Sequence, residues 1–242
     1  LIISMLPADM HLDIAKIAIK QKCHFLNSSY YDSKYAILEK GFISNKKVFI
    51  CEAGLDPGID HILASKLIRN FKENTKKEDL SSLSFTSMCG GFPLMPNKFK
   101  YKFSWTPLGV LKALRSPAKY INDFQKTEVP FPFQQIENVE FKNEKFETYP
   151  NRDSIPYIEA YQLTEYLKII EKFVRGTIRL DGWSKAWEEI FLKIKNNEDL
   201  GDLSNELWEV NQYEENEKDR VLLYVELIAK DKQNNKIYDK IF

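Results

Sequence analysis

The chain has 242 residues, 43% of them hydrophobic and 13% aromatic, which is enough to bury a core and excludes an intrinsically disordered protein. Lys plus Arg equals Asp plus Glu at 35 each, so no net charge attracts nucleic acid or an anionic membrane. No apolar run approaches the roughly 20 residues that span a bilayer. Three widely spaced cysteines indicate reduced thiols, and the three histidines form no metal-binding motif. We therefore expect a cytoplasmic protein without metal, nucleic-acid or membrane partners; mitochondrial import is the alternative, because a targeting segment could precede Leu1.

The first 72 residues alternate short apolar segments with amphipathic ones. Apolar runs predict buried strands over 1–7, 23–29 and 46–54. Helical spacing of apolar residues predicts helices over 9–18, 33–40 and 59–71. Strands that alternate with helices form a parallel sheet through right-handed crossovers. We therefore predict that residues 1–72 form half of a doubly wound α/β domain.

A charged stretch over 70–82 marks the expected domain boundary, and the pattern changes beyond it. Strands are expected over 82–91, 98–105, 129–133, 136–142, 145–149, 174–180 and 219–231. Helices are expected over 106–121, 156–173 and 183–195, the last with an apolar stripe that includes Trp183 and Trp187. Residues 80–242 are therefore predicted to form an α+β domain with a mixed sheet covered by helices.

The loops that follow the three predicted parallel strands are the places to look for a ligand site, because ligands bind beyond the carboxyl ends of such strands. After the second strand, Ser28 and Ser29 offer hydroxyls and Tyr30 offers a phenol that can donate a proton. A plain strand-to-helix turn is the alternative interpretation of these three residues.

The loop after the third strand reads GLDPGIDH, from Gly54 to His61. Its two glycines permit backbone conformations that bring the chain close to a flat ligand. Asp56 either caps the helix expected from Ile59 or faces a cofactor or a substrate amine. His61 is either a proton shuttle or an ordinary packed histidine.

The second domain supplies the cations. Arg152 lies in a polar loop, and Arg175 and Arg179 flank a Gly-Thr pair in a predicted strand. Arginines that face one cleft suit a substrate with more than one carboxylate, and surface ion pairs are the alternative. Cys89 ends a predicted strand, where a buried inert thiol is the simpler interpretation. The chain contains no GxGxxG, P-loop or GxSxG motif.

Seven segments together carry a resemblance: SMLP, SSYY, GLDPGIDH, CGGFP, YKFSW, YPNRDS and VRGTIRL, in this order. They resemble the saccharopine dehydrogenase family, L-glutamate-forming (saccharopine reductase) type, from Leu1 to about Leu180. The resemblance implies the second half of a Rossmann-type domain followed by an α+β domain for substrate binding and dimerisation. It also implies that the glycine-rich phosphate loop lies upstream of Leu1, so that the chain is a fragment, inactive alone.

The resemblance implies an NADP- or NAD-dependent oxidoreductase of lysine metabolism that interconverts saccharopine with L-glutamate and 2-aminoadipate 6-semialdehyde. It assigns the cofactor to Leu6, Pro7, Ser28, Ser29, Leu55, Asp56 and Pro57. It assigns the substrate to Ser29, Tyr30, Arg152, Thr177, Ile178 and Arg179. Tyr30, Asp56 and Cys89 are the candidates for proton handling or imine polarisation.

Two alternatives and an expectation about assembly accompany this hypothesis. A related imine reductase could act on polyamine-like or other amino acid conjugates, but Arg152 and Arg179 would repel cationic substrates. A non-catalytic dimerisation or scaffold protein would use an exposed tryptophan stripe at Trp183 and Trp187 as its interface. In either enzyme the protein is expected to be a homodimer.

Overall fold

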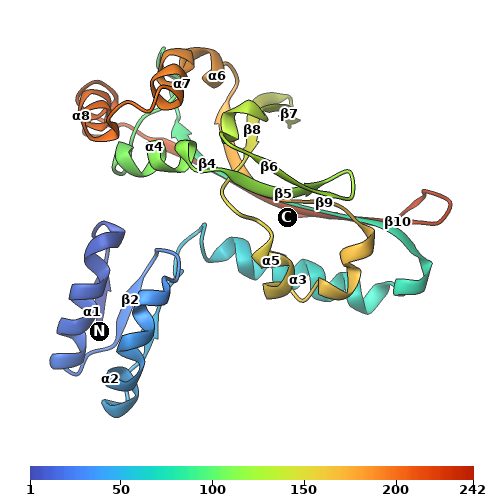
Figure 1. Ribbon diagram of the computed structural model, residues 1–242, viewed down its shortest axis with the longest axis horizontal. Coiled ribbons are helices and arrows are strands. Elements are labelled where there is room, and N and C mark those ends of the chain that lie inside the picture. The colour runs from blue at the N-terminus through green and yellow to red at the C-terminus, as the bar shows by residue number, and fades with distance from the viewer. The chain divides into compact units, whose positions relative to one another are not determined.

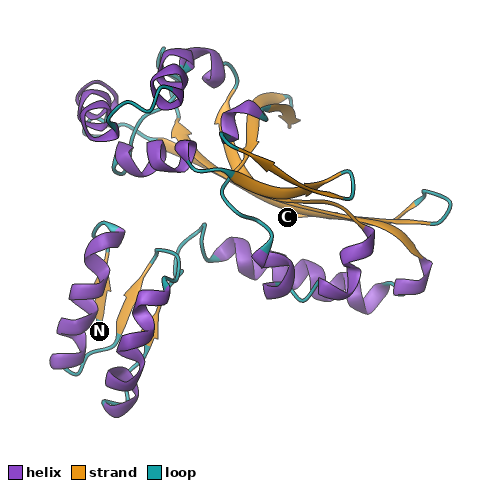
Figure 2. Ribbon diagram, in the orientation of Figure 1, coloured by secondary structure: helices purple, strands orange, loops and turns teal.

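The computed structural model describes all 242 residues, which divide into two compact units, Leu1–Leu63 (unit 1) and Ala64–Phe242 (unit 2). The boundary lies inside helix α3 (Ile59–Asn74). Figures 1 and 2 show the elements of each unit. None of the helices is long and apolar enough to cross a membrane.

Unit 1 has the predicted alternation of strands and helices. Its three strands, β1 (Ile2–Ser4), β2 (Phe25–Asn27) and β3 (Phe49–Ile50), form a parallel sheet in the order β1-β2-β3. The crossovers contain α1 (His11–Lys20) and α2 (Glu39–Ser44), each preceded by a 3-10 turn, η1 (Ala8–Met10) and η2 (Ser33–Leu38). The predicted parallel sheet with helical crossovers is confirmed.

The core of unit 1 lies on one face of this sheet. Phe25 stacks on Phe49 at 5.3 Å between ring centroids, and α1, η2 and α2 contribute buried side chains to the same cluster. On the opposite face Ile3 and Ile50 are 57% and 45% exposed. All-parallel sheets are normally covered on both faces, whereas the sheet of unit 1 is covered on one.

Unit 2 is built on an eight-stranded mixed sheet. Its strands are β4 (Leu80–Pro93), β5 (Ala118–Asn122), β6 (Gln125–Val129), β7 (Glu137–Phe141), β8 (Glu144–Pro150), β9 (Ile170–Leu180), β10 (Asp219–Asp231) and β11 (Lys236–Ile241). The main path runs β11-β10-β4-β9-β5-β6, and β8 pairs with β9 and with β7. Only β4 and β9 pair in parallel. The predicted mixed sheet is therefore confirmed.

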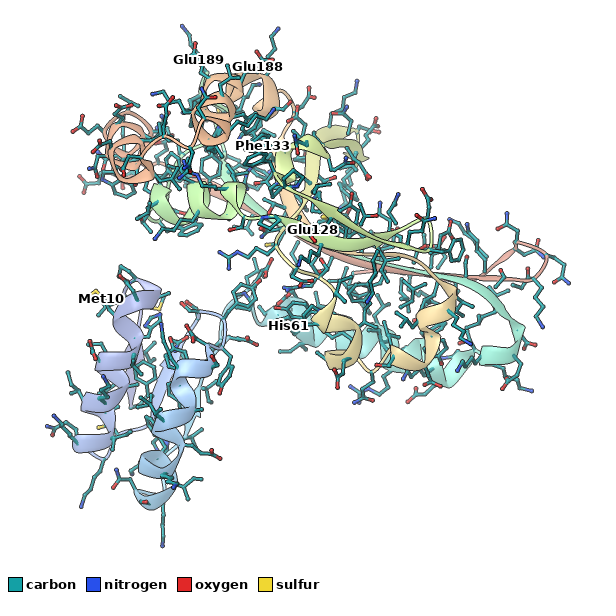
Figure 3. The ribbon with its side chains drawn as sticks, viewed as in Figure 1. Met10, His61, Glu128, Phe133, Glu188 and Glu189 are labelled. Atoms are coloured by element: carbon teal, nitrogen blue, oxygen red, sulfur yellow. The ribbon has the colours of Figure 1, made fainter.

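Helices pack on unit 2 in two groups (Figure 1). The residues of α3 that belong to unit 2 lie with α5 (Pro156–Ala160) and the 3-10 turn η5 (Thr164–Ile169) along the sheet, where Phe71 contacts Tyr166 and Tyr238. The second group gathers at one end of the long strands and comprises α4 (Pro107–Arg115), α6 (Trp183–Ala186), α7 (Glu188–Lys195) and α8 (Leu200–Asn211). Its core includes Phe133 of the 3-10 turn η4 (Pro132–Gln134), whereas Glu188 and Glu189 point outward from α7 (Figure 3).

Several predicted boundaries in unit 2 are wrong. Residues 98–105 form no strand, because Tyr101 and Phe103 are buried in the helical cluster instead of alternating across a sheet. The helix predicted over 106–121 ends at Arg115, and the run that follows Pro117 becomes β5. The predicted 156–173 helix is α5, η5 and the start of β9, and Pro130 and Pro132 end the predicted 129–133 strand in a 3-10 turn. Helix α8 and strand β11 were not predicted.

The interpretation of the tryptophan stripe as an exposed interface is also wrong. Trp183 and Trp187 are both fully buried, and the helix predicted over 183–195 breaks between α6 and α7 at Trp187. Their rings pack against Tyr149, Phe99 and each other at centroid distances of 5.2, 4.6 and 5.1 Å. The stripe is thus the centre of the helical core.

Candidate functional site

The carboxyl ends of the strands of unit 1 meet at one edge. The parallel register pairs Ser4 with Asn27 and Leu26 with Ile50, so the chain leaves all three strands on the same side. The residues predicted to bind cofactor follow the three strands there: Leu6 and Pro7, then Ser28 and Ser29, then Leu55, Asp56 and Pro57. The fold thus brings together the loops in which the cofactor candidates lie.

Hydrogen bonds tie the second and third of these loops together. The Glu52 backbone N–H donates to the Ser29 carbonyl at 3.0 Å, and the Tyr31 backbone N–H donates to Glu52 Oε1 at 3.0 Å. The Tyr30 hydroxyl donates to Asp56 Oδ1 at 2.6 Å. Two of the residues predicted to handle protons, Tyr30 and Asp56, therefore lie within hydrogen-bond distance of each other.

The turn before α3 assigns different tasks to its two aspartates. The Asp60 carboxylate is fully buried and accepts from the Gly58 backbone N–H at 2.7 Å, whereas Asp56 is exposed and accepts from Tyr30. Gly58 has φ +144°, and a Cβ there would overlap the carbonyl oxygens of Gly54 and Glu52. Only glycine fits this position, so the tight turn that presents Asp56 depends on it.

One hollow, of about 320 Å³, lies away from this edge. Another, of about 510 Å³, lies at the edge. It is lined by residues 51–54 and by Gly58, Ile59, His61 and Ile62. The His61 ring lies 3.8 Å from Glu52 Oε2 and 3.6 Å from Asp60 Oδ2, at the start of α3 (Figure 3). The histidine therefore stands between two carboxylates at the wall of this hollow.

His11 is a residue of this edge that the sequence analysis did not single out. Its ring is 1% exposed, with Nδ1 3.0 Å from Ser4 Oγ and Nε2 2.9 Å from Ser29 Oγ. Burial lowers the pKa of His11 below its ordinary value, the Lys34 charge lowers it further, and Asp9 opposes both. Its position four residues after Pro7, close to the end of the first predicted strand, is the sequence signal that could have identified it.

In unit 2 two candidate residues, Cys89 and Thr177, lie in one row across the sheet with Tyr149, which was not predicted. Cys89 of β4 is opposite Thr177 of β9, and Thr177 is opposite Tyr149 of β8, so the three share a face. Cys89 lies inside β4, which runs on to Pro93, so the prediction that it ends a strand is wrong. Burial raises the pKa of the Tyr149 phenol, opposed by the nearby Arg179 charge.

Arg179 lies on the same face, two residues beyond Thr177. It is 7% exposed, and its guanidinium carbon is 4.8, 5.5 and 5.4 Å from the ring centroids of Tyr101, Tyr149 and Trp183. Nη1 donates to the Ile178 carbonyl at 3.2 Å, and the buried Nε has no hydrogen-bond acceptor. Aromatic faces thus hold a buried cation in place while leaving one of its donors unsatisfied.

The carboxylate paired with Arg179 in register forms its hydrogen bonds elsewhere. Glu147 is paired with Arg179 across the β8–β9 ladder and is 5% exposed. Its oxygens instead accept from the Gly182 N–H at 3.0 Å, the Ser184 N–H at 2.7 Å and the Ser184 hydroxyl at 3.0 Å. Glu147 therefore anchors the start of α6.

The remaining substrate candidates differ in accessibility. Arg152, with φ +54°, is exposed in the loop after β8, and this loop is held to β9 by the bond from Asn151 N–H to the Arg175 carbonyl at 2.9 Å. Arg175 is buried and stacks on Tyr157 at 4.0 Å. The Ile178 side chain points into the core on the other face, so only its backbone is on the side of Thr177.

A match to a family model shows which family the chain belongs to. The model of the saccharopine dehydrogenase C-terminal domain matches residues 54–241. The chain belongs to this family. The resemblance expected from the seven segments is thereby confirmed.

Two individual relatives match a longer part of the chain than the family model does. The chain is 36% identical over 212 residues to saccharopine dehydrogenase [NADP(+), L-glutamate-forming] of Pyricularia oryzae, a match that covers 85% of the chain and 44% of that protein. It is 36% identical over 193 residues to the mitochondrial alpha-aminoadipic semialdehyde synthase of Mus musculus, covering 77% of the chain and 20% of that protein. The chain thus spans less than half the length of these relatives.

A solved structure extends the likeness to both units. The saccharopine dehydrogenase (L-Glu forming) of Saccharomyces cerevisiae is similar with a TM-score of 0.74 and 25% sequence identity. The match covers 99% of the chain and 70% of that protein. The α/β fold class with a mixed sheet in its second part is therefore confirmed.

Proposed function

We propose that this chain contributes the substrate-facing part of an NADP- or NAD-dependent oxidoreductase that interconverts saccharopine with L-glutamate and 2-aminoadipate 6-semialdehyde. The observation that carries the proposal is the buried Arg179 guanidinium, which three aromatic rings hold while its register neighbour Glu147 binds the start of α6. The names of the relatives, which specify saccharopine, NADP(+) and L-glutamate, supply the substrate class.

A substrate with several carboxylates suits the cations of unit 2. Saccharopine carries three carboxylates and a secondary amine, and guanidinium groups bind carboxylates with two parallel hydrogen bonds. We assign Arg179 to one carboxylate and the exposed Arg152 to another, with Thr177 and the Ile178 backbone beside them. Ser29 and Tyr30 are assigned to the substrate from unit 1.

Residues 1–72 are proposed to be the C-terminal half of a Rossmann-like NAD(P)-binding domain, and residues 80–242 the substrate-binding domain. The exposure of Ile3 and Ile50 on one face of the parallel sheet supports the first assignment. The exposed apolar side chain of Leu6 and the hydroxyls of Ser28 and Ser29 fit the flat ring and carboxamide of a nicotinamide. Leu55, Asp56 and Pro57 are assigned to the same ligand, which when bound supplies or accepts the hydride.

The chemistry in the reductive direction needs a proton as well as a hydride. The amine of glutamate condenses with the aldehyde, water leaves, and the resulting C=N bond takes up hydride at carbon and a proton at nitrogen. The Tyr30–Asp56 hydrogen bond supports this pair as the group that holds or delivers that proton. Cys89, opposite Thr177 in the same row, is proposed to polarise the imine.

A related imine reductase for polyamine-like substrates is less favoured by the same observations. Two arginines would repel a cationic substrate, and the Nε of one of them, Arg179, is buried without a hydrogen-bond acceptor. The scaffold alternative loses its motivation, because the tryptophans that were to form its interface are buried.

Steady-state kinetics of the full-length protein test the proposal. Wild type is expected to oxidise saccharopine with NADP or NAD, and Arg152→Ala to raise the KM for saccharopine by about tenfold or more while the KM for the cofactor stays unchanged. Arg69→Ala, at an exposed arginine on α3, is the matched control and should leave both constants unchanged. Equal losses for saccharopine and cofactor in Arg152→Ala would contradict its assignment as a carboxylate clamp.

We also propose that the protein is a homodimer and acts in the cytoplasm, with mitochondria as the alternative compartment. Apolar side chains support self-association: Met95 and Val210 are 76% and 75% exposed, and the Asn97–Asn211 hydrogen bond joins the loop and the helix that carry them. Sedimentation of the full-length protein should give twice the monomer mass, and Val210→Lys should shift it to the monomer. A monomeric wild type at micromolar concentration would contradict the proposed dimer. Imaging of the tagged protein tests the compartment.

A further inference from the structure

His11 is tied on both sides to hydroxyl groups at the strand-end edge of unit 1. Its Nδ1 lies 3.0 Å from Ser4 Oγ, at the end of β1, and its Nε2 lies 2.9 Å from Ser29 Oγ, in the loop after β2. With the ring 1% exposed, water does not compete for either nitrogen. The imidazole therefore connects two loops that lead into the candidate site.

The environment of the ring keeps it neutral. Its charged neighbours are Lys34 on η2 and Asp9 on η1, and the two hydroxyl partners carry no charge. Phe25 of β2 contributes an apolar edge, at 6.4 Å between ring centroids. Burial and the lysine together lower the pKa of His11 below its ordinary value, and Asp9 opposes them. At neutral pH the ring then has one donor and one acceptor nitrogen.

A neutral imidazole between two hydroxyls determines the direction of both hydrogen bonds. If Nε2 carries the proton, it donates to Ser29 Oγ, and the Ser29 hydroxyl proton points elsewhere. If Nδ1 carries the proton, Ser29 donates to Nε2 and presents only lone pairs to its surroundings. The first tautomer leaves the Ser29 proton available to a ligand, and the second leaves only acceptor lone pairs, so the tautomer of His11 decides whether Ser29 can donate.

Hydrogen bonds already fix the backbone of Ser29, so only the orientation of its hydroxyl is left to be determined. The Ser29 N–H donates to Asn27 Oδ1 at 2.9 Å, and the Ser29 carbonyl accepts from the Glu52 N–H at 3.0 Å. Without His11 the side chain could still rotate about χ1 among its staggered positions. The ring thus completes the orientation of a residue whose main chain is held.

We propose that His11 is a positioning residue that orients the Ser29 hydroxyl toward the substrate and cofactor. The inference rests on the proposed function, in which Ser29 contacts both ligands, and it assigns His11 no contact with either. It extends the site from the exposed loops to a buried side chain of α1.

A double-mutant cycle in the full-length protein tests the coupling. His11→Leu and Ser29→Ala are each expected to lower kcat/KM for saccharopine by about tenfold, the loss of one oriented hydrogen bond. The double variant should match Ser29→Ala within about twofold, because His11 acts only through that hydroxyl. Multiplied losses of about a hundredfold, or a lowered melting temperature with unchanged kinetic constants, would overturn the proposal.

Conservative and control variants separate positioning from packing. His11→Gln keeps one donor and one acceptor and should recover most of the lost kcat/KM, whereas His11→Leu, although it fills space, should not. His24→Gln is the matched control: its exposed ring only accepts from the Val48 N–H at 3.1 Å, so the kinetic constants should stay unchanged. A poor recovery in His11→Gln with a normal His24→Gln would count against the proposal.

The failure of this inference differs from a failure of the proposed function. If wild type does not turn over saccharopine, the proposed function fails, and the His11 link is tested by the ring ¹⁵N resonances of the full-length protein. One neutral tautomer whose Nε2 resonance shifts in Ser29→Ala supports the link. An even tautomer mixture that does not respond to Ser29→Ala removes it, whatever the enzyme assay gives.

Discussion

The two units hold their candidate residues in opposite ways. In unit 1 they lie in loops at the edge of a small parallel sheet, where Tyr30 and Asp56 meet near the surface through a hydrogen bond. In unit 2 all of them except the exposed Arg152 lie on strands of a large mixed sheet, where Arg179 is buried among aromatic rings. The candidate residues of unit 1 are therefore held by hydrogen bonds between loops, and most of those of unit 2 by packing.

This difference predicts how each part responds to mutation. Loop residues held by exposed hydrogen bonds contribute little to the free energy of unfolding, so their replacement should affect ligand binding more than stability. Residues packed in a core contribute to both, because the side chains that fix the site also fill the protein interior.

The largest expected effect is on the helical core of unit 2. Trp183→Ala removes a fully buried ring that contacts Tyr149, Trp187 and Arg179, and should lower the free energy of unfolding by about 3–5 kcal/mol. All four tryptophans lie in unit 2, so tryptophan fluorescence during urea unfolding follows that unit. Trp208→Ala, at a site 40% exposed, is the control and should cost much less. Equal costs at the two positions would contradict the packing argument.

The next effect is on the buried carboxylate beside Arg179. Glu147→Gln replaces an acceptor of three hydrogen bonds by a group that must turn an NH₂ toward one of the donors, and should cost about 2 kcal/mol. Urea unfolding measures this cost. The control is Glu144→Gln, which removes only an exposed ion pair with Arg220 and should cost less. A Glu147→Gln protein as stable as wild type would mean that water replaces these bonds.

The sequence predicts those features of the fold that local patterns determine. The alternation of apolar runs and helical segments predicted the parallel sheet of unit 1, and motif order predicted the family. The tryptophan spacing also identified the residues of the helical core, although not their burial, because a stripe at helical spacing has the same pattern in a core and in an interface. What covers a stripe depends on contacts far along the chain, here with Phe99 and Tyr149.

Errors in the predicted strands and helices have the same origin. Residues 98–105 alternate like a strand, yet Tyr101 and Phe103 are buried by α7 and α8, which come about 90 residues later in the sequence. His11 lay outside the candidate list because its partners, Ser4 and Ser29, are 7 and 18 residues away and meet it only in the folded sheet. Neither pairing has a local signal.

A smaller effect is expected at the Tyr30–Asp56 hydrogen bond, and it should appear in activity alone. Under the proposed function, Tyr30→Phe should lower kcat for saccharopine oxidation by about tenfold, since it removes the donor at 2.6 Å from Asp56 Oδ1. Thermal unfolding should be unchanged, because the bond is exposed. Tyr31→Phe is the control: its backbone N–H, and not its phenol, contacts Glu52. A loss of stability without a loss of kcat would reverse the contrast between the units.

The smallest expected effect is a pH dependence of opposite sign in the two units. Burial lowers the pKa of His11 in unit 1 below its ordinary 6.5, and burial, then the Asp239 charge, raise the pKa of Glu226 in unit 2 above its ordinary 4.5. Lys236 and Lys172 oppose the shift of Glu226. Both groups are therefore favoured in their neutral form by the folded state.

The signs follow from which state binds protons more readily. The unfolded chain protonates its histidine first, so the stability that neutral His11 gives to unit 1 is present above pH 6.5 and is lost as the pH falls through the lowered pKa. The folded chain keeps the Glu226 proton longer, so that contribution is present below pH 4.5 and is lost as the pH rises through the raised pKa. Glu226→Gln should therefore stabilise unit 2 at neutral pH and not below pH 4.5, and His11→Gln should flatten the acid side for unit 1. Hydrogen exchange, measured separately for peptides of each unit, gives the pH dependence of stability of unit 1 and of unit 2. If the two stabilities change in the same direction with pH, packing and not ionisation dominates at these two positions.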